Sequence, residues 1–172
     1  MKSKILIVAV VLIAANFAFA QTAKRSPYIG YKYHGVVPSS TLPNGVKHFG
    51  GGLIGDFKAD PVYGLSQVQK GKTKMLWLEV STGQDATGVT GWKVLDVLSF
   101  PSLLRSDYLF FYGDPAAECT RSGKDIPNLV GVGKIMRKQG IFRPSRLWVA
   151  DLATKKLKSI SLSGIKCEYS EP

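Results

Sequence analysis

The sequence predicts a mainly β fold: a sandwich, a barrel or a bent antiparallel sheet, with at most one or two short helices. Three observations predict it. Short apolar or aromatic-rich segments follow one another at close spacing, connections containing Gly or Pro separate them, and helical periodicity is weak after the first twenty residues. This pattern is typical of antiparallel strands that form a sandwich, a barrel or a strongly bent sheet.

Composition and turns place the individual strands. Residues 62–69 and 73–81 flank Lys70-Gly71-Lys72, which is a hairpin signature because Gly tolerates positive φ. Residues 146–152 and 156–162 form a second predicted hairpin. The other strand candidates are residues 92–98, 108–112, 129–136 and 165–169. Only residues 102–106 and 135–139 favour a turn or two of helix.

The N-terminal part of the chain has a different composition. Residues 21–60 are rich in Gly, Pro, Tyr and Ser, and residues 49–52, with three consecutive glycines, are the loosest point. We expect an irregular segment there with one or two short strands. It forms one domain with the β-rich core of residues 61–172.

The first twenty residues have the features of a signal peptide. Lys2 and Lys4 precede an apolar run over residues 5–15, and Ala18-Phe19-Ala20 gives the small-x-small pattern that signal peptidase reads. We therefore expect cleavage between Ala20 and Gln21 and a protein that is periplasmic or secreted. The apolar run is shorter than the roughly 20 residues that span a bilayer, so no integral membrane anchor is expected.

Size and charge bound the function further. Removing 20 of the 172 residues leaves 152, which is the size of a single domain. The formal net charge is +11, and it falls to +9 when Lys2 and Lys4 are removed. In an exported protein this charge favours an anionic polymer or an acidic protein as partner, whereas nucleic acid is not an expected partner. The net charge by itself indicates a general tendency to associate with anionic partners and does not indicate a defined site.

The two cysteines predict one disulfide. An even count in an exported chain favours pairing, so Cys119 and Cys167 are expected to bond and to tie the last strand to a loop in the middle of the chain. The chain-entropy model assigns about 4 kcal/mol to closing a loop of this length.

Two near matches to phosphate-binding loops fail. The stretch ending Gly71-Lys72-Thr73 has Ser66 where the motif requires Gly, and Gly133-Lys134 is followed by Ile135 where it requires Ser or Thr. We therefore expect no nucleotide ligand.

Nucleophile and metal chemistry also lack their motifs. No G-x-S-x-G elbow occurs. His34 and His48 lie fourteen positions apart, without the spacing of a metal site, and both are interpreted as structural or surface residues. No cofactor and no metal are expected.

One acid has an unusual context. On a regular strand, Asp96 shares a face with Trp92, Val94 and Leu98, where partial burial would raise its pKa and suit a general acid. The alternative is a structural carboxylate satisfied by backbone N–H groups or by a basic neighbour. Asp96 is thus the one weak catalytic candidate.

Aromatic and basic residues supply candidate contact surfaces. Tyr28, Tyr31 and Tyr33 either stack on sugar rings or cover the edge of the sheet and fill space. The stretch between Asp125 and Asp151 contains no acid and forms, around a loop, a candidate site for an anion. Its basic residues are Lys134, Arg137, Lys138, Arg143 and Arg146.

These observations lead to three functional hypotheses. The first is a non-enzymatic binding module for an anionic envelope component or an acidic protein. The second is a secreted hydrolase, acting on glycans or esters, that depends on carboxylates. The third is a structural envelope protein without a ligand.

Overall fold

The computed structural model describes residues 25–35, 41–101, 103, 106–111 and 117–169. The predicted signal peptide lies outside these residues, as do residues 102, 104 and 105 of one predicted helical turn and residue 112 at the end of one predicted strand. Within the part that is described, no helix is long and apolar enough to cross a membrane.

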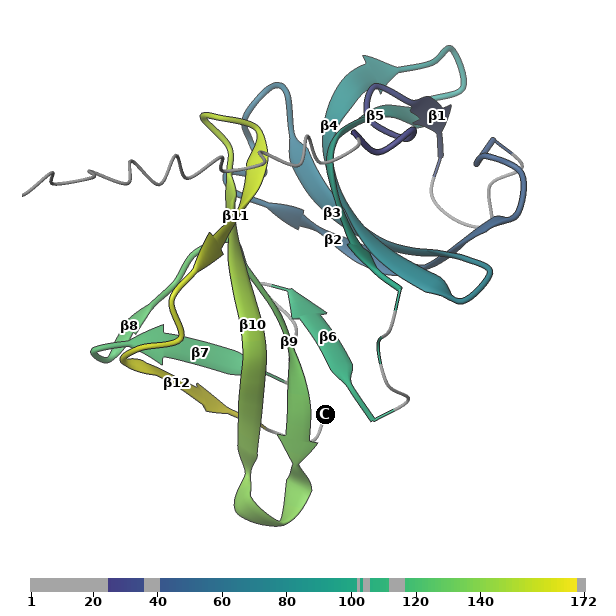
Figure 1. Ribbon diagram of the computed structural model, residues 1–172. Helices are drawn as coiled ribbons and strands as arrows, with labels where there is room; N and C mark the ends of the chain where they lie inside the picture. Colours follow the sequence, from purple (N-terminus) through teal and green to yellow (C-terminus); the bar gives the residue numbers. More distant parts are fainter. Residues whose placement is uncertain (1–24, 36–40, 102, 104–105, 112–116, 170–172) are drawn as a thin grey trace, which may run out of the picture.

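The chain forms two antiparallel sheets (Figure 1), which confirms the mainly β prediction. The first is a five-stranded sheet that curls into half a barrel, and it is called the half-barrel sheet below. Its strands, in spatial order, are β1 (Lys32–His34), β5 (Thr90–Phe100), β4 (Thr73–Gln84), β3 (Tyr63–Lys70) and β2 (Val46–Ile54).

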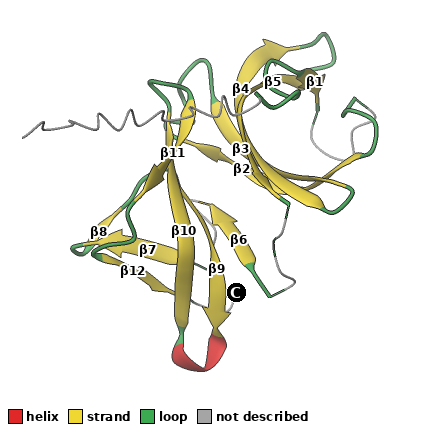
Figure 2. Cartoon of the chain, in the orientation of Figure 1, coloured by secondary structure: helices red, strands yellow, loops and turns green. Residues whose placement is uncertain are grey.

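The second sheet is seven-stranded. Its path runs β6 (Tyr108–Phe111), β9 (Leu129–Met136), β10 (Ile141–Asp151), β12 (Ile165–Glu168), β7 (Glu118–Arg121) and β8 (Lys124–Asp125), and β11 (Lys156–Ile160) pairs with β10. The tip of the β9–β10 hairpin is a short 3-10 turn, η1 (Arg137–Gln139), drawn red in Figure 2. It falls within the predicted helical turn at residues 135–139.

The N-terminal segment is more regular than its composition predicts. The three glycines at 50–52 lie inside β2, a strand of nine residues, so the expectation that this is the loosest point is wrong. A register shift between His48 and Gly50 accommodates the sequence, and Gly50 has φ 147°, a conformation that suits glycine. Pairing with β3 on either side of the bulge keeps the segment extended.

The main core lies between the two sheets. From the half-barrel sheet it contains buried leucines such as Leu76 and Leu78, and from the seven-stranded sheet it contains Val130, Val132 and Trp148. Burying each of these side chains contributes roughly 1.5–3 kcal/mol, so this layer is a major source of stability.

The half-barrel sheet is apolar on its concave face too. Trp77 is fully buried there, with Tyr28 and Tyr33 from the N-terminal segment packed against it at ring-centroid distances of 5.3 and 6.3 Å. The tyrosines therefore fill the concave face of the sheet. This explains why residues 75–78 of β4 are continuously apolar, because both faces of the strand are covered.

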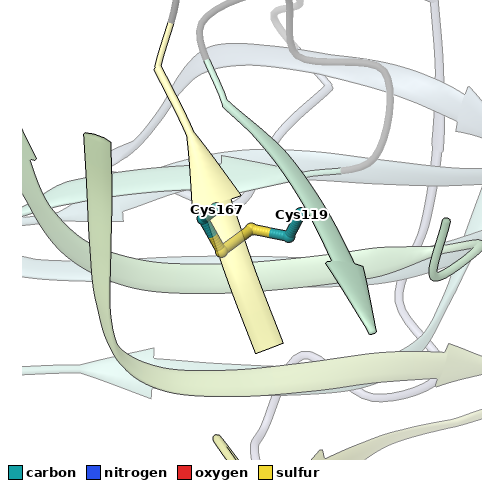
Figure 3. The surroundings of a disulfide bond; sticks show 2 residues. All are labelled: Cys119 and Cys167. Atoms are coloured by element: carbon teal, nitrogen blue, oxygen red, sulfur yellow. A yellow bond between two sulfur atoms is a disulfide. The ribbon is translucent and has the colours of Figure 1, made fainter. Parts of the chain in front are cut away.

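The predicted disulfide is present (Figure 3). Cys119 lies in β7, not in a loop as expected, and Cys167 faces it from β12 with 4.0 Å between the Cα atoms. Both are buried in a second apolar cluster with Phe110 and Phe142. The bond therefore joins the C-terminal strand to a neighbouring strand of the same sheet.

Asp96 does not share the face of Trp92 and Val94. A register shift opposite Leu78 and Glu79 interrupts β5, so Val94 pairs with Glu79 while Asp96 pairs with Leu78. Asp96 thus lies on the side of the sheet that faces the second sheet. Its carboxylate accepts hydrogen bonds from the Leu157 N–H at 2.9 Å and from Lys156 Nζ at 3.0 Å. This is the structural alternative considered for Asp96, and it links β5 to β11.

The substitution Asp96→Ala should therefore cost stability. It leaves the partly buried Leu157 N–H without its acceptor, and we expect the free energy of unfolding to fall by about 1–3 kcal/mol. The control Lys156→Ala removes only a half-exposed ion pair and should cost about 0–1 kcal/mol. Urea denaturation of both variants measures the difference, and equal losses would contradict the role given to the Leu157 hydrogen bond.

Candidate functional site

The concave face of the half-barrel sheet contains a cavity of about 380 Å³. Each of the five strands contributes to its lining, through Tyr33 of β1, His48 of β2, Ser66 of β3, Glu79 of β4 and Trp92 of β5. Most of the lining surface is apolar. The cavity thus places a few polar groups from residues far apart in the sequence around one apolar space.

Glu79 is the central polar group. It lies on the same face of β4 as Trp77, and only 2% of its surface is exposed. Its Oε1 accepts a hydrogen bond from the Tyr33 hydroxyl at 2.7 Å, and its Oε2 accepts one from the Ser66 hydroxyl, also at 2.7 Å. Three strands, β1, β3 and β4, therefore hold the carboxyl group in one orientation.

Burial changes the acid–base properties of this group. Desolvation raises the pKa of Glu79 to about 7, although the hydrogen bonds from Ser66 and Tyr33 oppose the change. Burial, reinforced by the charge of Glu79, also raises the pKa of Tyr33 above its ordinary value. Near neutral pH, Glu79 therefore exists in both its neutral and its charged form, while Tyr33 stays a hydroxyl donor.

His48 provides a second polar group in the lining. Its Nδ1 accepts a hydrogen bond from the Gly50 N–H at 3.1 Å, which assigns the ring proton to Nε2. Burial lowers the pKa of His48, so the neutral ring is favoured. The bulge in β2 thus fixes the tautomer of the ring through the backbone of Gly50.

Two glycines keep the space next to Ser66 and Trp92 open. A Cβ at Gly51 would lie 2.5 Å from the Leu65 carbonyl oxygen, and one at Gly64 would lie 3.3 Å from the Trp92 ring. Larger residues at these positions would displace the strands or fill the cavity. The glycine-rich composition of the N-terminal half therefore has a steric role at this site.

The described lining of the cavity contains an acidic side chain without a basic one to balance it. Among the described residues that line the cavity, Glu79 is the one carboxyl, and none is Lys or Arg. The imidazole of His48 favours its neutral form. The arrangement therefore favours a cation or a neutral hydrogen-bond donor and disfavours an anion.

No protein-family model, curated protein or solved structure matches this chain. The fold gives no functional precedent, and a fold by itself would not define a function. A mostly apolar cavity with a few converging polar groups and a carboxyl of altered pKa is nevertheless the usual setting of a small-ligand site. The cavity around Glu79 is therefore the candidate functional site.

The structure places all five predicted basic residues on the β9–β10 hairpin. Lys134 of β9 pairs with Arg143 of β10, and Arg137 and Lys138 form the η1 turn at its tip. Arg146 lies beyond a register shift, with its guanidinium 5.6 and 5.7 Å from the ring centroids of Phe100 and Trp148. Arg146 is therefore engaged with aromatic rings at the junction of the two sheets.

Acids absent from this stretch in the sequence lie beside it in space. Glu168 of β12 pairs with Ile141 of β10, and Glu118 of β7 pairs with Glu168. Exposed carboxylates therefore adjoin the tip of the basic hairpin, and this face carries both signs of charge. Binding of an anion by the hairpin stays a prediction.

The other sequence candidates lie apart from the cavity or lack partners for metal binding. His34 is exposed, with Nδ1 3.9 Å from the Asp85 carboxylate. The residues that the structure describes contain no group of three or more His, Cys, Asp or Glu arranged to hold a metal ion.

Glu79 is not among the residues predicted from the sequence, although the sequence contains a signal for it. Glu79 directly follows the apolar run Met75-Leu76-Trp77-Leu78 and is the one acid of β4. Strand alternation puts it on the face of Met75 and Trp77. The buried acid on the face of Trp92 and Val94 is therefore Glu79 of β4, and the expectation that Asp96 lies on that face is wrong.

Glu79 should make the stability of the protein depend on pH. Its pKa of about 7 lies above the ordinary value of 4.5. Between pH 4.5 and pH 7, the folded chain therefore keeps a proton that the unfolded chain has lost. This stabilisation is complete below about pH 4.5 and is lost as the pH rises through 7, by about 3 kcal/mol in total. Denaturant unfolding at pH 5, 6, 7 and 8 measures it.

The variant Glu79→Gln isolates this effect because it removes the titrating group and keeps His48. We expect the loss of stability between pH 5 and pH 8 to be roughly 2–3 kcal/mol smaller in Glu79→Gln than in the unsubstituted protein. Parallel pH profiles for the two proteins would show that Glu79 does not titrate in this range.

Proposed function

We propose that this protein is a non-enzymatic binding protein that holds a small ligand in the cavity around Glu79. The ligand has a compact, mainly apolar body and carries an ammonium group or another hydrogen-bond donor. The observation that supports this most is a buried carboxyl group in an apolar cavity whose described lining contains no Lys or Arg.

The hydrogen bonds of Glu79 leave room for a ligand. A carboxylate has about four acceptor positions, and Tyr33 and Ser66 occupy two of them. A ligand donor that takes another would compensate the cost of burying the charge. The rings of Tyr33 and Trp92 line the same cavity and favour a cation, since aromatic faces attract positive charge.

Under the hydrolase hypothesis, the catalytic carboxyl would be Glu79 and not Asp96, because Asp96 faces away from the cavity. A glycoside hydrolase needs two carboxyl groups on opposite sides of the scissile bond. The described lining contributes one carboxyl, Glu79. Binding is therefore the function that these residues support better.

Export remains part of the proposal. The features of residues 1–20 are those of a signal peptide, and the Cys119–Cys167 bond suits an oxidising compartment. An exported protein with this ligand cavity would bind its ligand outside the cytoplasm.

Matched ligands test the charge preference of the cavity. Benzylamine, benzyl alcohol and benzoate share a ring and differ in charge, and their affinities can be measured at pH 8 by NMR titration. We expect benzylammonium to bind at least about tenfold more tightly than benzoate, because an interaction of about 1.4 kcal/mol with the Glu79 carboxylate gives that ratio. Signals of Trp92 should shift on binding.

The variant Glu79→Gln should lose most of this preference while still binding benzyl alcohol. Glu118→Gln is the control, since it removes an exposed acid of the other sheet. The proposal is wrong if benzoate binds as tightly as benzylammonium, or if the control variant loses the preference to the same extent.

The export proposal predicts the start of the mature chain. Expressed from residue 1 in a bacterial host, the protein recovered from the envelope fraction should begin at Gln21 and contain no free thiol. Ala20→Arg should block cleavage and leave a product longer by 20 residues. Intact mass and N-terminal sequencing distinguish the products, and recovery of a cytoplasmic chain that begins at Met1 would contradict export.

A further inference from the structure

An open groove of about 700 Å³, called the second cavity or chamber below, lies at the other end of the concave face of the half-barrel sheet. Met75, Trp77 and Glu79 follow one another on the inner face of β4, and the second cavity is lined by Met75 whereas the first is lined by Glu79. The rings of Trp77 and Tyr28 pack together between these ends. The aromatic pair thus separates two chambers of the same concave face.

Strand register defines the floor and one wall of the second chamber. Lys70 of β3 pairs with Thr73 of β4, and Met75 of β4 pairs with Ser99 of β5, so these four side chains share the inner face of the sheet. Val97, opposite Trp77, belongs to the same face. The apolar floor is formed by Met75 and Val97, and polar groups surround it.

The N-terminal segment borders the other side. Arg25, Ser26, Pro27 and Tyr28 line the chamber from this segment, and Lys70 lines it from the end of the β3–β4 hairpin. The Lys70 ammonium lies 6.0 Å from the centre of the Tyr28 ring, so the ring of the segment and the cation of the hairpin approach each other.

The chamber has the opposite electrostatic character to the cavity around Glu79. Two cations, Arg25 and Lys70, line it together with the hydroxyl groups of Ser26, Thr73 and Ser99. Its described lining contains no Asp or Glu. Guanidinium, ammonium and hydroxyl groups around an apolar floor are the donors that bind a phosphate or carboxylate attached to an apolar body.

We propose that this chamber is a binding site for a small organic anion. Its phosphate or carboxylate group would lie between Arg25 and Lys70, and its apolar part would pack on Tyr28, Met75 and Val97. The site is distinct from the cavity around Glu79 and does not depend on the function proposed for it. At this site, part of the excess positive charge of the protein would bind an anion, separately from the β9–β10 hairpin.

Other lysines of the same hairpin provide matched controls. Lys72 lies in the turn between β3 and β4, and Lys74 pairs with Phe100 on the opposite face of the sheet. Neither lines the chamber. Removing one of them changes the net charge by the same amount as removing Lys70, so general attraction to anions can be separated from binding at a site.

Phenyl phosphate, phenol and inorganic phosphate are the probes, titrated at pH 7.5 in 0.15 M salt by calorimetry and NMR. We expect phenyl phosphate to bind at least tenfold more tightly than phenol, which lacks the anion, and more tightly than inorganic phosphate, which lacks the ring. Lys70→Gln and Arg25→Gln should each weaken phenyl phosphate binding about tenfold or more, since each removes a charge-assisted contact. Lys70→Arg should retain binding within about threefold.

The controls Lys72→Gln and Lys74→Gln should leave the affinity within about twofold. Glu79→Gln should also leave it unchanged, which separates this site from the cavity of the proposed function. The proposal is overturned if phenyl phosphate does not bind saturably, if phenol binds equally well, or if Lys72→Gln weakens binding as much as Lys70→Gln. Circular dichroism melting of each variant confirms that a lost affinity is not a lost fold.

Discussion

Burial of both faces of β4 is the constraint on which the rest of this structure depends. Leu76 and Leu78 face the second sheet, whereas Met75 and Trp77 face the concave side, and no single packing layer could cover both sets. The second sheet covers one face. The N-terminal segment must cover the other, and it does so with tyrosines packed against Trp77. Because this cover is a short segment and not a third sheet, it leaves a chamber on each side of the Trp77 ring.

Glu79 departs from what stability alone would favour. A buried carboxyl costs free energy, and two hydroxyl donors compensate only part of the cost, as the raised pKa of the group records. An apolar residue at this position would avoid the cost. Residues that break the rules of packing in this way are concentrated at functional sites.

Two strand irregularities decide which side chains enter the cavity. The register shift in β5 turns Asp96 away from the concave face and towards β11, where it joins the two sheets. The shift in β2 brings Gly50 against His48 and sets the tautomer of that ring. Since side chains alternate with a period of two, one extra residue in a strand reverses the face of everything after it. The chemistry of this site therefore depends on single-residue changes in register.

The sequence by itself determined the mainly β class, most of the strands, the hairpin predicted over residues 146–162 and the Cys119–Cys167 pairing. Strand alternation and turn residues are local properties of the chain, and two cysteines allow one intramolecular pairing. The sequence pattern placed Asp96 on the face of Trp92 and Val94, which is wrong. Only the tertiary structure decided that Glu79 is the buried acid of that face, that β2 is a long strand despite its glycines, and that Glu168 adjoins the basic hairpin. The physical reason is that bulges and pairing partners are fixed by contacts between distant strands, which an alternating pattern within one strand does not encode.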